Sequence, residues 1–498
     1  MQAQVLSFDY TYTAPTTSHA LLQTKCMSSD YVTLSTISLG SDYFYLTRTD
    51  VNGNIVWAKV IQDTALFRVI PDAMIETNDG GLCISVFYRN QMQNTMNNEG
   101  TAIIRLDSAG NILWQEKLYI NSLRFYCKAI IEDSAGYYYL GYERQTTVPG
   151  NPDKSNLLLK LNPSGLPVWA RESSESGYIL KKMQLLPNNK LALGNYAINQ
   201  QGAKIVVTDT SGNVQSSTFY LTDTTTVSEF ADFTFHNNGS LYALLQFETG
   251  NKTALYVYDS VGTFLSGNTI DSLLPVKLIN ENGQLISLTY NSTSDKTIIT
   301  DWSTSSTNAI ELNAGQGFEP KDFHRNTDGS ITCYGKTPSG SVFAQRLIKT
   351  LPATTPLPVS GCAVNPSSLS FQPVSIDDST VSETFIPTNF NVAAVAFVAT
   401  PLNLTVTSNC LIIGLAETES AEQIAVYPNP AVELINFNKS VFPGSVFTVY
   451  DISGKIKLCE TVQHSSEIAI GQMQDGMYFW QLNQNGRIYS GKLVITSQ

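Results

Sequence analysis

Short runs in which apolar and polar residues alternate fill the first 350 residues of this 498-residue chain, and turn-forming residues separate the runs. Residues 83–88 (CISVFY) and 137–142 (YYYLGY) are two examples. A period of two predicts β-strands, and the Gly, Asn and Asp residues between the runs predict tight turns. The pattern therefore predicts an all-β region of short antiparallel strands.

One turn recurs along this region with the same residue order. Its best copies are residues 50–57 (DVNGNIVW), 107–114 (DSAGNILW) and 162–169 (NPSGLPVW), and weaker copies begin at Asp209, Asp259 and Asp301. The first residue of the turn advances by 57, 55, 47, 50 and 42 residues, which are spacings typical of β-propeller blades. Because the Trp of the turn recurs in register, we interpret it as a residue that packs blades together.

A second turn marks each unit and follows a short apolar strand, as at residues 78–81 (NDGG) and 133–136 (DSAG). The two markers together define seven units of four strands, so we predict a seven-bladed β-propeller over residues 1–349. The last unit is one strand short, whereas residues 4–12 form an alternating strand that belongs to no unit. We expect this N-terminal strand to complete blade seven, which would close the ring and remove an exposed edge.

Each unit also carries a charged residue just before its first apolar strand, and the first strand of a propeller blade faces the central channel. These residues are Lys25, Asp72, Lys128, Lys182, Asp232, Lys277 and Asp322. Two interpretations remain open. The seven side chains form a mutually paired ring that orients the blades, or they form a mixed-charge mouth that binds a ligand, because convergent polar groups at a concave end are typical of binding sites.

Prolines mark residues 350–361 as a linker after the propeller. Residues 362–414 return to strand-like alternation, but this small β segment is short for an independent core. A disulfide between Cys362 and Cys410 would close a 47-residue loop and stabilise the segment by roughly 4 kcal/mol in an oxidising compartment. The other five cysteines lie in apolar strand patterns and are expected to be buried free thiols.

Residues 415–423 are polar and suit an exposed, cleavable hinge, and residues 424–498 then carry four motifs in order. The motifs are VYPNP, VYDISGK, GMYFW and KLVI, with Pro428, Asn429, Pro430, Asp451, Gly454, Lys455, Gly476, Tyr478 and Lys492 as their characteristic residues. The prolines fix backbone angles at an entry turn, and Asp451 to Gly454 predict a hairpin turn. In this order the motifs resemble the C-terminal sorting domain of type IX secretion cargo in Bacteroidetes.

The resemblance implies a small β-sandwich that an outer-membrane type IX translocon and its sortase or shuttle recognise through residues 424–498. The protein would then reach the cell surface or the extracellular space after passing through the periplasm. Residues 496–498 extend past the usual final strand of such a domain. Residues 1–4 lack the features of a signal peptide, so we expect the numbering to start near the mature N-terminus.

Composition agrees with an extracellular destination, since only 14% of the residues are charged. The net charge of -12 argues against nucleic acid as a partner, because phosphates repel an acidic surface. No run approaches the roughly 20 apolar residues that a transmembrane helix needs. The sequence therefore predicts partners among neutral ligands or proteins, and no transmembrane segment.

Sequence motifs for catalysis are missing, so we assign no catalytic residue, metal or cofactor. The four histidines lack metal-ligand spacing, and Asp232 and Asp322 are the only carboxylates that we can place at the channel mouth as a glycan-cleaving pair. We therefore favour a secreted, non-enzymatic binding or scaffold protein whose propeller contacts a surface protein or polysaccharide. The alternatives are a glycan-active propeller hydrolase or lyase, and an accessory component of the surface secretion or gliding machinery.

Overall fold

The computed structural model shows strands and turns, and it describes most of the chain. The residues that it describes are 7–13, 19–25, 30–36, 43–63, 66, 68–89, 99–119, 123–146, 154–186, 188–197, 202–222, 227–236, 238–247, 252–260, 263–271, 273–281, 284–291, 294, 296–302, 308–312, 318–339, 342–350, 364–367, 372–373, 376–380, 385–388, 391–393, 398–402, 405–412, 424–438, 441–451, 455–463, 467–484 and 487–496. Within these residues, no helix is long and apolar enough to cross a membrane.

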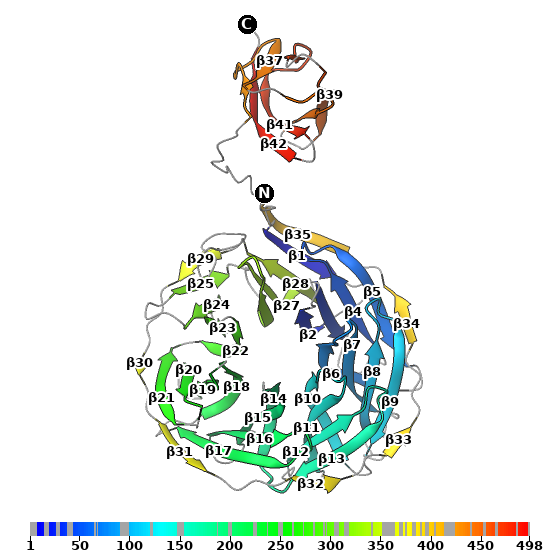
Figure 1. Cartoon of the computed structure of the whole chain (residues 1–498), viewed down its shortest axis with the longest axis vertical. Coiled ribbons are helices and arrows are strands. Elements are labelled where there is room, and N and C mark those ends of the chain that lie inside the picture. The colour runs from blue at the N-terminus through cyan, green and yellow to red at the C-terminus, as the bar shows by residue number, and fades with distance from the viewer. Residues whose placement is uncertain are drawn as a thin grey trace. The chain divides into compact units, whose positions relative to one another are not determined.

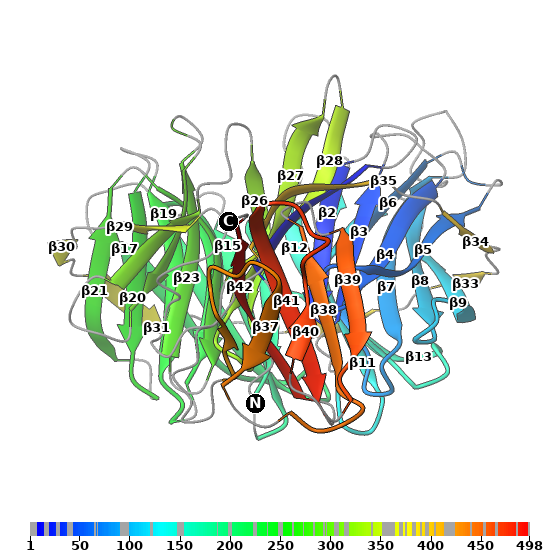
Figure 2. The same cartoon turned by 90° about the horizontal axis from the view of Figure 1, so that it is seen from above.

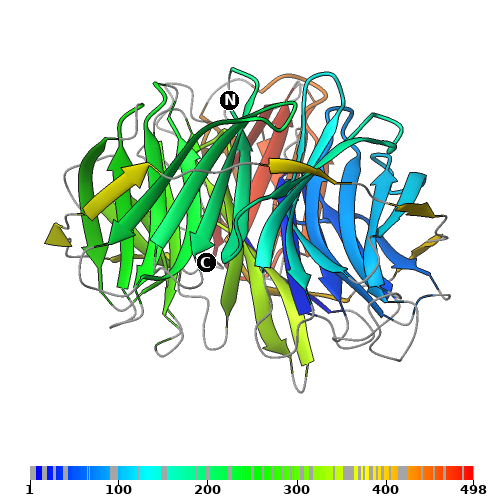
Figure 3. The same ribbon diagram turned by 90° about the horizontal axis from the view of Figure 1, so that it is seen from below.

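The chain divides into two compact units, Met1–Gly414 and Leu415–Gln498, and each is described here by itself. The described part of the first unit contains seven five-stranded antiparallel sheets arranged around one axis (Figure 1). This arrangement is a β-propeller in which each sheet is one blade, and it confirms the all-β fold class. Figures 2 and 3 show the ring from its edge, with the blades standing side by side.

Four consecutive strands form the inner part of blades 1 to 6. Blade 1 contains β2 (His19–Lys25), β3 (Tyr31–Thr36), β4 (Tyr43–Thr49) and β5 (Ile55–Gln62), and blade 2 contains β6 (Arg68–Glu76), β7 (Leu82–Arg89), β8 (Glu99–Leu106) and β9 (Ile112–Tyr119). Blade 3 contains β10 (Leu123–Glu132), β11 (Tyr138–Thr146), β12 (Lys154–Leu161) and β13 (Pro167–Ser173), and blade 4 contains β14 (Tyr178–Leu185), β15 (Lys190–Ala197), β16 (Gly202–Asp209) and β17 (Val214–Thr222). Blade 5 contains β18 (Val227–Phe235), β19 (Leu241–Phe247), β20 (Lys252–Tyr258) and β21 (Phe264–Ile270), and blade 6 contains β22 (Leu274–Glu281), β23 (Gln284–Asn291), β24 (Lys296–Asp301) and β25 (Asn308–Leu312).

Blade 7 joins the two ends of the propeller sequence. It consists of β26 (Glu319–Arg325), β27 (Ile331–Ser339), β28 (Val342–Lys349) and the N-terminal strand β1 (Ser7–Thr13), which pairs antiparallel with β28. The Tyr12 side chain of β1 is buried, and its hydroxyl donates a 2.5 Å hydrogen bond to the Gly53 carbonyl of blade 1. The N-terminal strand therefore belongs to the last blade and contacts the first.

The segment after the propeller sequence forms a belt, which we define as residues 364–412. Its strands are β29 (Val364–Ser367), β30 (Gln372–Pro373), β31 (Ile376–Thr380), β32 (Phe385–Thr388), β33 (Asn391–Ala393), β34 (Val398–Pro401) and β35 (Thr405–Ile412). They add a fifth strand to blades 6, 5, 4, 3, 2, 1 and 7, in that order. The belt therefore runs around the outside of the ring against the direction of the blades, and its strands β29 to β34 are drawn in yellow in Figure 1.

The belt differs from the small self-contained β segment that the sequence predicts. Strands of two to eight residues cannot bury a core of their own, whereas the fourth strand of each blade offers unpaired backbone groups. Of the two cysteines in the expected disulfide, Cys410 lies in β35 opposite Asp9, and Cys362 lies outside the described residues. Cys83, Cys127 and Cys333 are buried free thiols, whereas Cys459 is free but exposed, contrary to expectation.

Glycines on second strands let neighbouring blades approach each other closely. A Cβ atom added to Gly194 of β15 would lie 2.5 Å from Phe230 and 2.6 Å from Phe233, which both belong to β18 of the next blade. Such contacts are shorter than van der Waals distances, so any side chain at this position would push the two blades apart.

The recurring turn is held by its own Asp side chain. Asp50 Oδ1 accepts hydrogen bonds from the amides of Asn52 and Asn54 at 2.8 and 2.9 Å, and the same geometry recurs at Asp209. The Trp57 indole donates a hydrogen bond of 3.1 Å to the Ser108 carbonyl in the corresponding turn of blade 2. The Trp residue therefore packs one blade against the next, as the sequence indicates.

The second unit is a small β-sandwich. A three-stranded sheet contains β36 (Val426–Tyr427), β37 (Leu434–Phe437) and β40 (Glu467–Ala469), and a four-stranded sheet contains β38 (Val446–Tyr450), β39 (Ile456–Thr461), β41 (Gly476–Gln484) and β42 (Arg487–Ile495). The core between the sheets includes Phe447 and Trp480, whose rings lie 5.9 Å apart.

Candidate functional site

Every blade's first strand carries a β-bulge, and the bulges set the register of the predicted charged ring. Asp72 and Lys128 occupy the bulge itself in blades 2 and 3. The other described members follow the bulge by one residue; they are Lys182, Asp232, Lys277 and Asp322. Lys25 is the last residue of β2 and lies four positions beyond the bulge of blade 1. The predicted ring therefore mixes three register positions, because a bulge adds a residue that sequence spacing does not reveal.

In blades 4 to 6, the charged residues connect one blade to the next. The Lys182 ammonium lies 2.5 Å from Asp232 Oδ1 and donates a hydrogen bond of 2.7 Å to the Phe233 carbonyl. The other oxygen of Asp232 accepts a 2.8 Å hydrogen bond from the Leu278 amide. Asp232 therefore joins three consecutive blades, and its side chain is buried.

In blades 6 and 7, Lys277 forms an ion pair with Asp322, and His324 Nε2 lies 3.6 Å from the same carboxylate. Burial alone would raise the pKa of Asp322, but the charges of Lys277 and His324 outweigh burial and lower it. Asp322 is therefore held in its ionised form, which suits a structural pair and does not suit a general acid.

Asp72 connects blades 2 and 3, since its Oδ2 accepts a hydrogen bond of 2.7 Å from the Cys127 amide. Burial raises the pKa of Asp72 from 3.8 to about 7, although the Cys127 amide, the Ser85 hydroxyl and the charge of Lys128 act in the opposite direction. Together with the pairs in blades 4 to 7, this contact agrees with a ring that orients the blades.

Lys128 differs from the other ring lysines, because its partner is in its own blade and its surroundings are rich in cations. We define the Tyr126 cluster as Arg68, Arg89, Glu99, Arg124, Tyr126, Lys128, Glu143 and Lys154. It contains two triads in which two cations share one carboxylate. In the first, Arg89 and Arg124 bind Glu99, with 2.7 Å between Arg89 and the carboxylate.

In the second triad, Lys128 and Lys154 lie 3.2 and 2.7 Å from the two carboxylate oxygens of Glu143. Tyr126 lies between the triads: the Lys128 ammonium is 5.7 Å from the centre of its ring, and its hydroxyl interacts electrostatically with Arg124. Burial raises the pKa of Tyr126, so its hydroxyl stays protonated and able to donate at neutral pH.

Strand direction brings the Tyr126 cluster together. Within a blade, the first and third strands begin where the second and fourth strands end, and we call this side of the ring the entry face. Arg68 begins β6, Arg89 ends β7, Glu99 begins β8 and Lys154 begins β12, so all four lie at the entry face of blades 2 and 3. In β10, Arg124, Tyr126 and Lys128 alternate with buried residues and share one face of the strand. Sequence reasoning missed the cluster because its members come from six strands.

The sorting motifs meet at one edge of the sandwich. Asn429 Nδ2 donates a hydrogen bond of 2.8 Å to the Lys492 carbonyl, and Asn429 Oδ1 accepts one of 2.8 Å from the Val494 amide. The Pro428 to Pro430 turn is therefore bound to the last strand. Asp451 Oδ1 accepts a 3.1 Å hydrogen bond from the Lys455 amide across the predicted hairpin turn, whose Gly454 lies outside the described residues.

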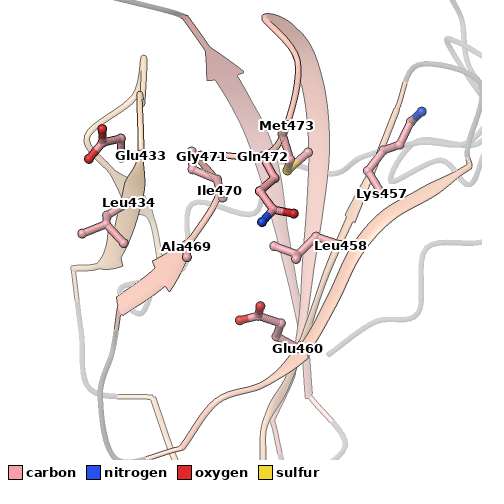
Figure 4. A pocket seen from close by; sticks show the side chains of 10 residues that line it. All are labelled: Glu433, Leu434, Lys457, Leu458, Glu460, Ala469, Ile470, Gly471, Gln472 and Met473. Carbon is pink, nitrogen blue, oxygen red and sulfur yellow. The ribbon is translucent and has the colours of Figure 1, made fainter.

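The GMYFW motif forms the start of β41. Gly476 is its first residue, and the buried Tyr478 donates a 2.8 Å hydrogen bond to the Gln474 carbonyl. A hollow lies between the two sheets, where Leu434, Leu458 and Ile470 line it beside charged residues (Figure 4). Among the residues that the structure describes, no group of three or more His, Cys, Asp or Glu side chains could hold a metal ion.

Residues 425–496 match the family model of the secretion system C-terminal sorting domain. The match confirms the resemblance of the four motifs, and the chain therefore ends in a type IX secretion sorting domain. This domain marks the protein for export to the cell surface or the extracellular space. No curated protein matches the chain.

Solved structures with similar β-rich architecture share little sequence with the chain. A protein of unknown function from Dyadobacter fermentans is 9% identical, with a TM-score of 0.39 over 58% of this chain and 99% of that one. The polysaccharide lyase Uly1 is 10% identical, with a TM-score of 0.41 over 68% of this chain and 90% of that one. An extracellular domain described as part of a hybrid two-component system of B. thetaiotaomicron is 9% identical, with a TM-score of 0.33 over 96% of this chain and 68% of that one. At TM-scores this low, the likenesses carry no argument about function.

Proposed function

We propose that this exported protein acts at the cell surface as a non-enzymatic binding protein, and that its ligand contacts the entry face of blades 2 and 3. The Tyr126 cluster carries the proposal. It combines a partly exposed aromatic ring with cations that two buried carboxylates hold in place. Preorganised polar groups around an aromatic surface are typical of ligand sites. Of the predicted ring, Lys128 belongs to this site, and the other members remain candidates at the inner strands.

The contacts of Asp232 and Asp322 favour binding over glycan cleavage. A glycoside hydrolase needs one carboxyl group that keeps its proton and one that is ionised, close to each other. Asp232 is bound to Lys182, and Asp322 is bound to Lys277 in the blade between them. The hydrolase or lyase alternative therefore has to use other residues, and product formation from glycans in the binding assay would support it.

Residues 424–498 contact the export machinery in this proposal. The translocon and its shuttle or sortase would recognise the sandwich, and cleavage in residues 415–423 would release the propeller with its belt. A role as a component of the secretion or gliding machinery is the alternative, and it predicts that the protein stays bound to the translocon after export.

Retention of the purified full chain on outer-membrane preparations of the producing bacterium tests the binding function, with an excess of isolated residues 415–498 added to block retention through the sorting domain. We expect Tyr126→Ala to lose most of the retention. Its melting temperature should fall only slightly, because the ring packs on Phe87 with 4.9 Å between ring centres but is partly exposed. Lys296→Ala, which removes an exposed lysine of blade 6, is the control. Equal retention of all three proteins would contradict a site at the entry face of blades 2 and 3.

A further inference from the structure

We infer that the Tyr126 cluster binds an acidic polysaccharide, whose carboxylate or sulfate groups contact the two triads on either side of Tyr126. The inference rests on the proposed function in one respect, namely that a ligand binds at this face. It goes further by naming the chemical class of the ligand from the charges, burial and geometry of the cluster.

The charge of the cluster is opposite to that of the whole chain. Five cations surround two carboxylates, which gives the cluster a net charge of +3, whereas the chain carries -12. Asp72 also interacts with Lys128, and burial raises the pKa of Asp72, so its carboxyl offsets the excess only in part. The nearby pair of Arg144 and Glu172 is neutral and leaves the excess unchanged.

Burial makes this excess positive charge unfavourable without an anion. The Glu99 side chain is fully buried and that of Glu143 is 5% exposed. Each carboxylate already forms ion pairs with two cations of its triad. The four cations of the two triads remain between 15% and 32% exposed and are therefore only partly solvated. Partly desolvated cations that outnumber their paired carboxylates attract an anionic ligand more strongly than fully exposed cations do.

Arg68 adds to this excess. The Arg68 Nε atom is buried and has no hydrogen-bond partner among the described residues. The positive charge of Arg68 interacts electrostatically with the Tyr126 hydroxyl. A buried guanidinium donor without an acceptor is costly, and an anionic oxygen of a ligand would satisfy it.

The arrangement favours a polymer of acidic sugars over an isolated anion. Arginines at one side and lysines at the other offer two anion contacts with an aromatic ring between them. The C–H face of a sugar ring packs well on an aromatic side chain, and the protonated Tyr126 hydroxyl can donate to a sugar oxygen. A saccharide with anionic groups on successive rings therefore matches the order cation, aromatic ring, cation.

Calorimetric titration of the full chain with a polygalacturonate hexasaccharide, and with the same hexasaccharide after methyl esterification, tests the inference. We expect the acidic form to bind, its affinity to fall as salt is added, and the neutral ester to bind at least about tenfold more weakly. Equal binding of both forms would overturn the acidic class while leaving a saccharide site in place.

Three variants separate charge from folding. Glu143→Gln removes one negative charge but keeps an amide oxygen that can accept a hydrogen bond from one of the two lysines, so it should tighten binding of the acidic hexasaccharide. K128Q/K154Q removes two positive charges and should weaken binding by about tenfold or more. The triple variant K128Q/E143Q/K154Q leaves no unpaired buried carboxylate and should also weaken binding while keeping the wild-type melting temperature. Lys296→Gln is the control, and affinity that does not follow the charge of the cluster would contradict the inference.

The same titrations distinguish this inference from the proposed function. If no acidic saccharide binds, but retention on outer membranes still depends on Tyr126, the binding function stands and the saccharide class falls. If an acidic phosphopeptide displaces the outer-membrane ligand and the hexasaccharide does not, the ligand is a protein and the inference is overturned. If neither retention nor titration depends on Tyr126, both proposals fail.

Discussion

At the scale of single residues, hydrogen bonds and ion pairs between blades decide which charged residues are structural. Sequence spacing places Asp72, Asp232 and Asp322 just before the innermost strands, whereas the structure places them within β6, β18 and β26. Spacing cannot place them in register, because the bulge that shifts each strand has no sequence signature here. It also cannot find Glu99, whose two arginines come from different blades.

Asp72 predicts a pH dependence of stability. Its pKa is raised from 3.8 to about 7 in the folded protein, so the folded state binds the proton more tightly than the unfolded state does. The resulting contribution to stability is fully present below about pH 3.8 and is lost as the pH rises towards 7. We expect the melting temperature to fall between about pH 4 and pH 7, and Asp72→Asn to reduce this fall.

Asp322 does not interfere with this test, since its lowered pKa makes its contribution change only at more acidic pH. Scanning calorimetry of the two proteins at several pH values is the measurement. Parallel melting curves for the wild type and Asp72→Asn across this range would show that the carboxyl of Asp72 titrates normally.

At the scale of strands, packing of one blade on the next depends on small residues at the contact. Gly194→Ala should lower the free energy of unfolding by about 2 kcal/mol, because the added methyl group overlaps the rings of Phe230 and Phe233. Denaturant unfolding of the full chain is the measurement. Gly471→Ala is the matched control, because its added Cβ would be 3.8 Å from the nearest atom, and an equal effect of both changes would refute the packing argument.

The belt shows what alternation in a sequence can and cannot predict. Strands lie within residues 364–412, where the sequence alternates, but a strand pattern does not identify the partner of each strand. The partners of β31, for example, lie in β17, more than 150 residues earlier in the chain. The unpaired fourth strands of the blades decide the arrangement, and each of these edges exists only once its blade has formed.

The disulfide between Cys362 and Cys410 stays a prediction. Cys362 precedes β29 of blade 6 by two residues, and Cys410 lies in β35 of blade 7, so the bond would join the two ends of the belt on consecutive blades. We expect the exported protein to migrate faster on gels without reductant, and Cys362→Ser to abolish the difference and to lower stability by roughly 4 kcal/mol or less. Cys459→Ser is the control, and two reactive thiols in denatured, unreduced protein would exclude the bond.

At the scale of the whole molecule, the two units separate delivery from binding. The four motifs predict the sorting domain in full because its function depends on short local sequences, such as the turn that Asn429 joins to the last strand. The ligand site of the propeller depends on contacts between blades, and sequence patterns do not contain them. Destination was therefore easier to predict than activity.

Removal of residues 424–498 should stop export without unfolding the propeller. The two units are separate compact bodies, so the remaining chain keeps all seven blades and the belt. Fractionation should find the shortened protein in the periplasm, with a protease-resistant core of unchanged size. Its appearance in the medium at wild-type levels would show that a different part of the chain directs export.

The belt ties completion of the fold to the order in which the chain is made. Ser7 pairs with Ile412. Both edges of the first strand, β1, are therefore paired only after almost the whole propeller unit has been synthesised. Every truncated chain that ends before residue 364 leaves seven fourth strands open to edge-to-edge association. An incomplete chain therefore exposes the unpaired edges of its fourth strands, whereas the belt covers these edges in the complete chain.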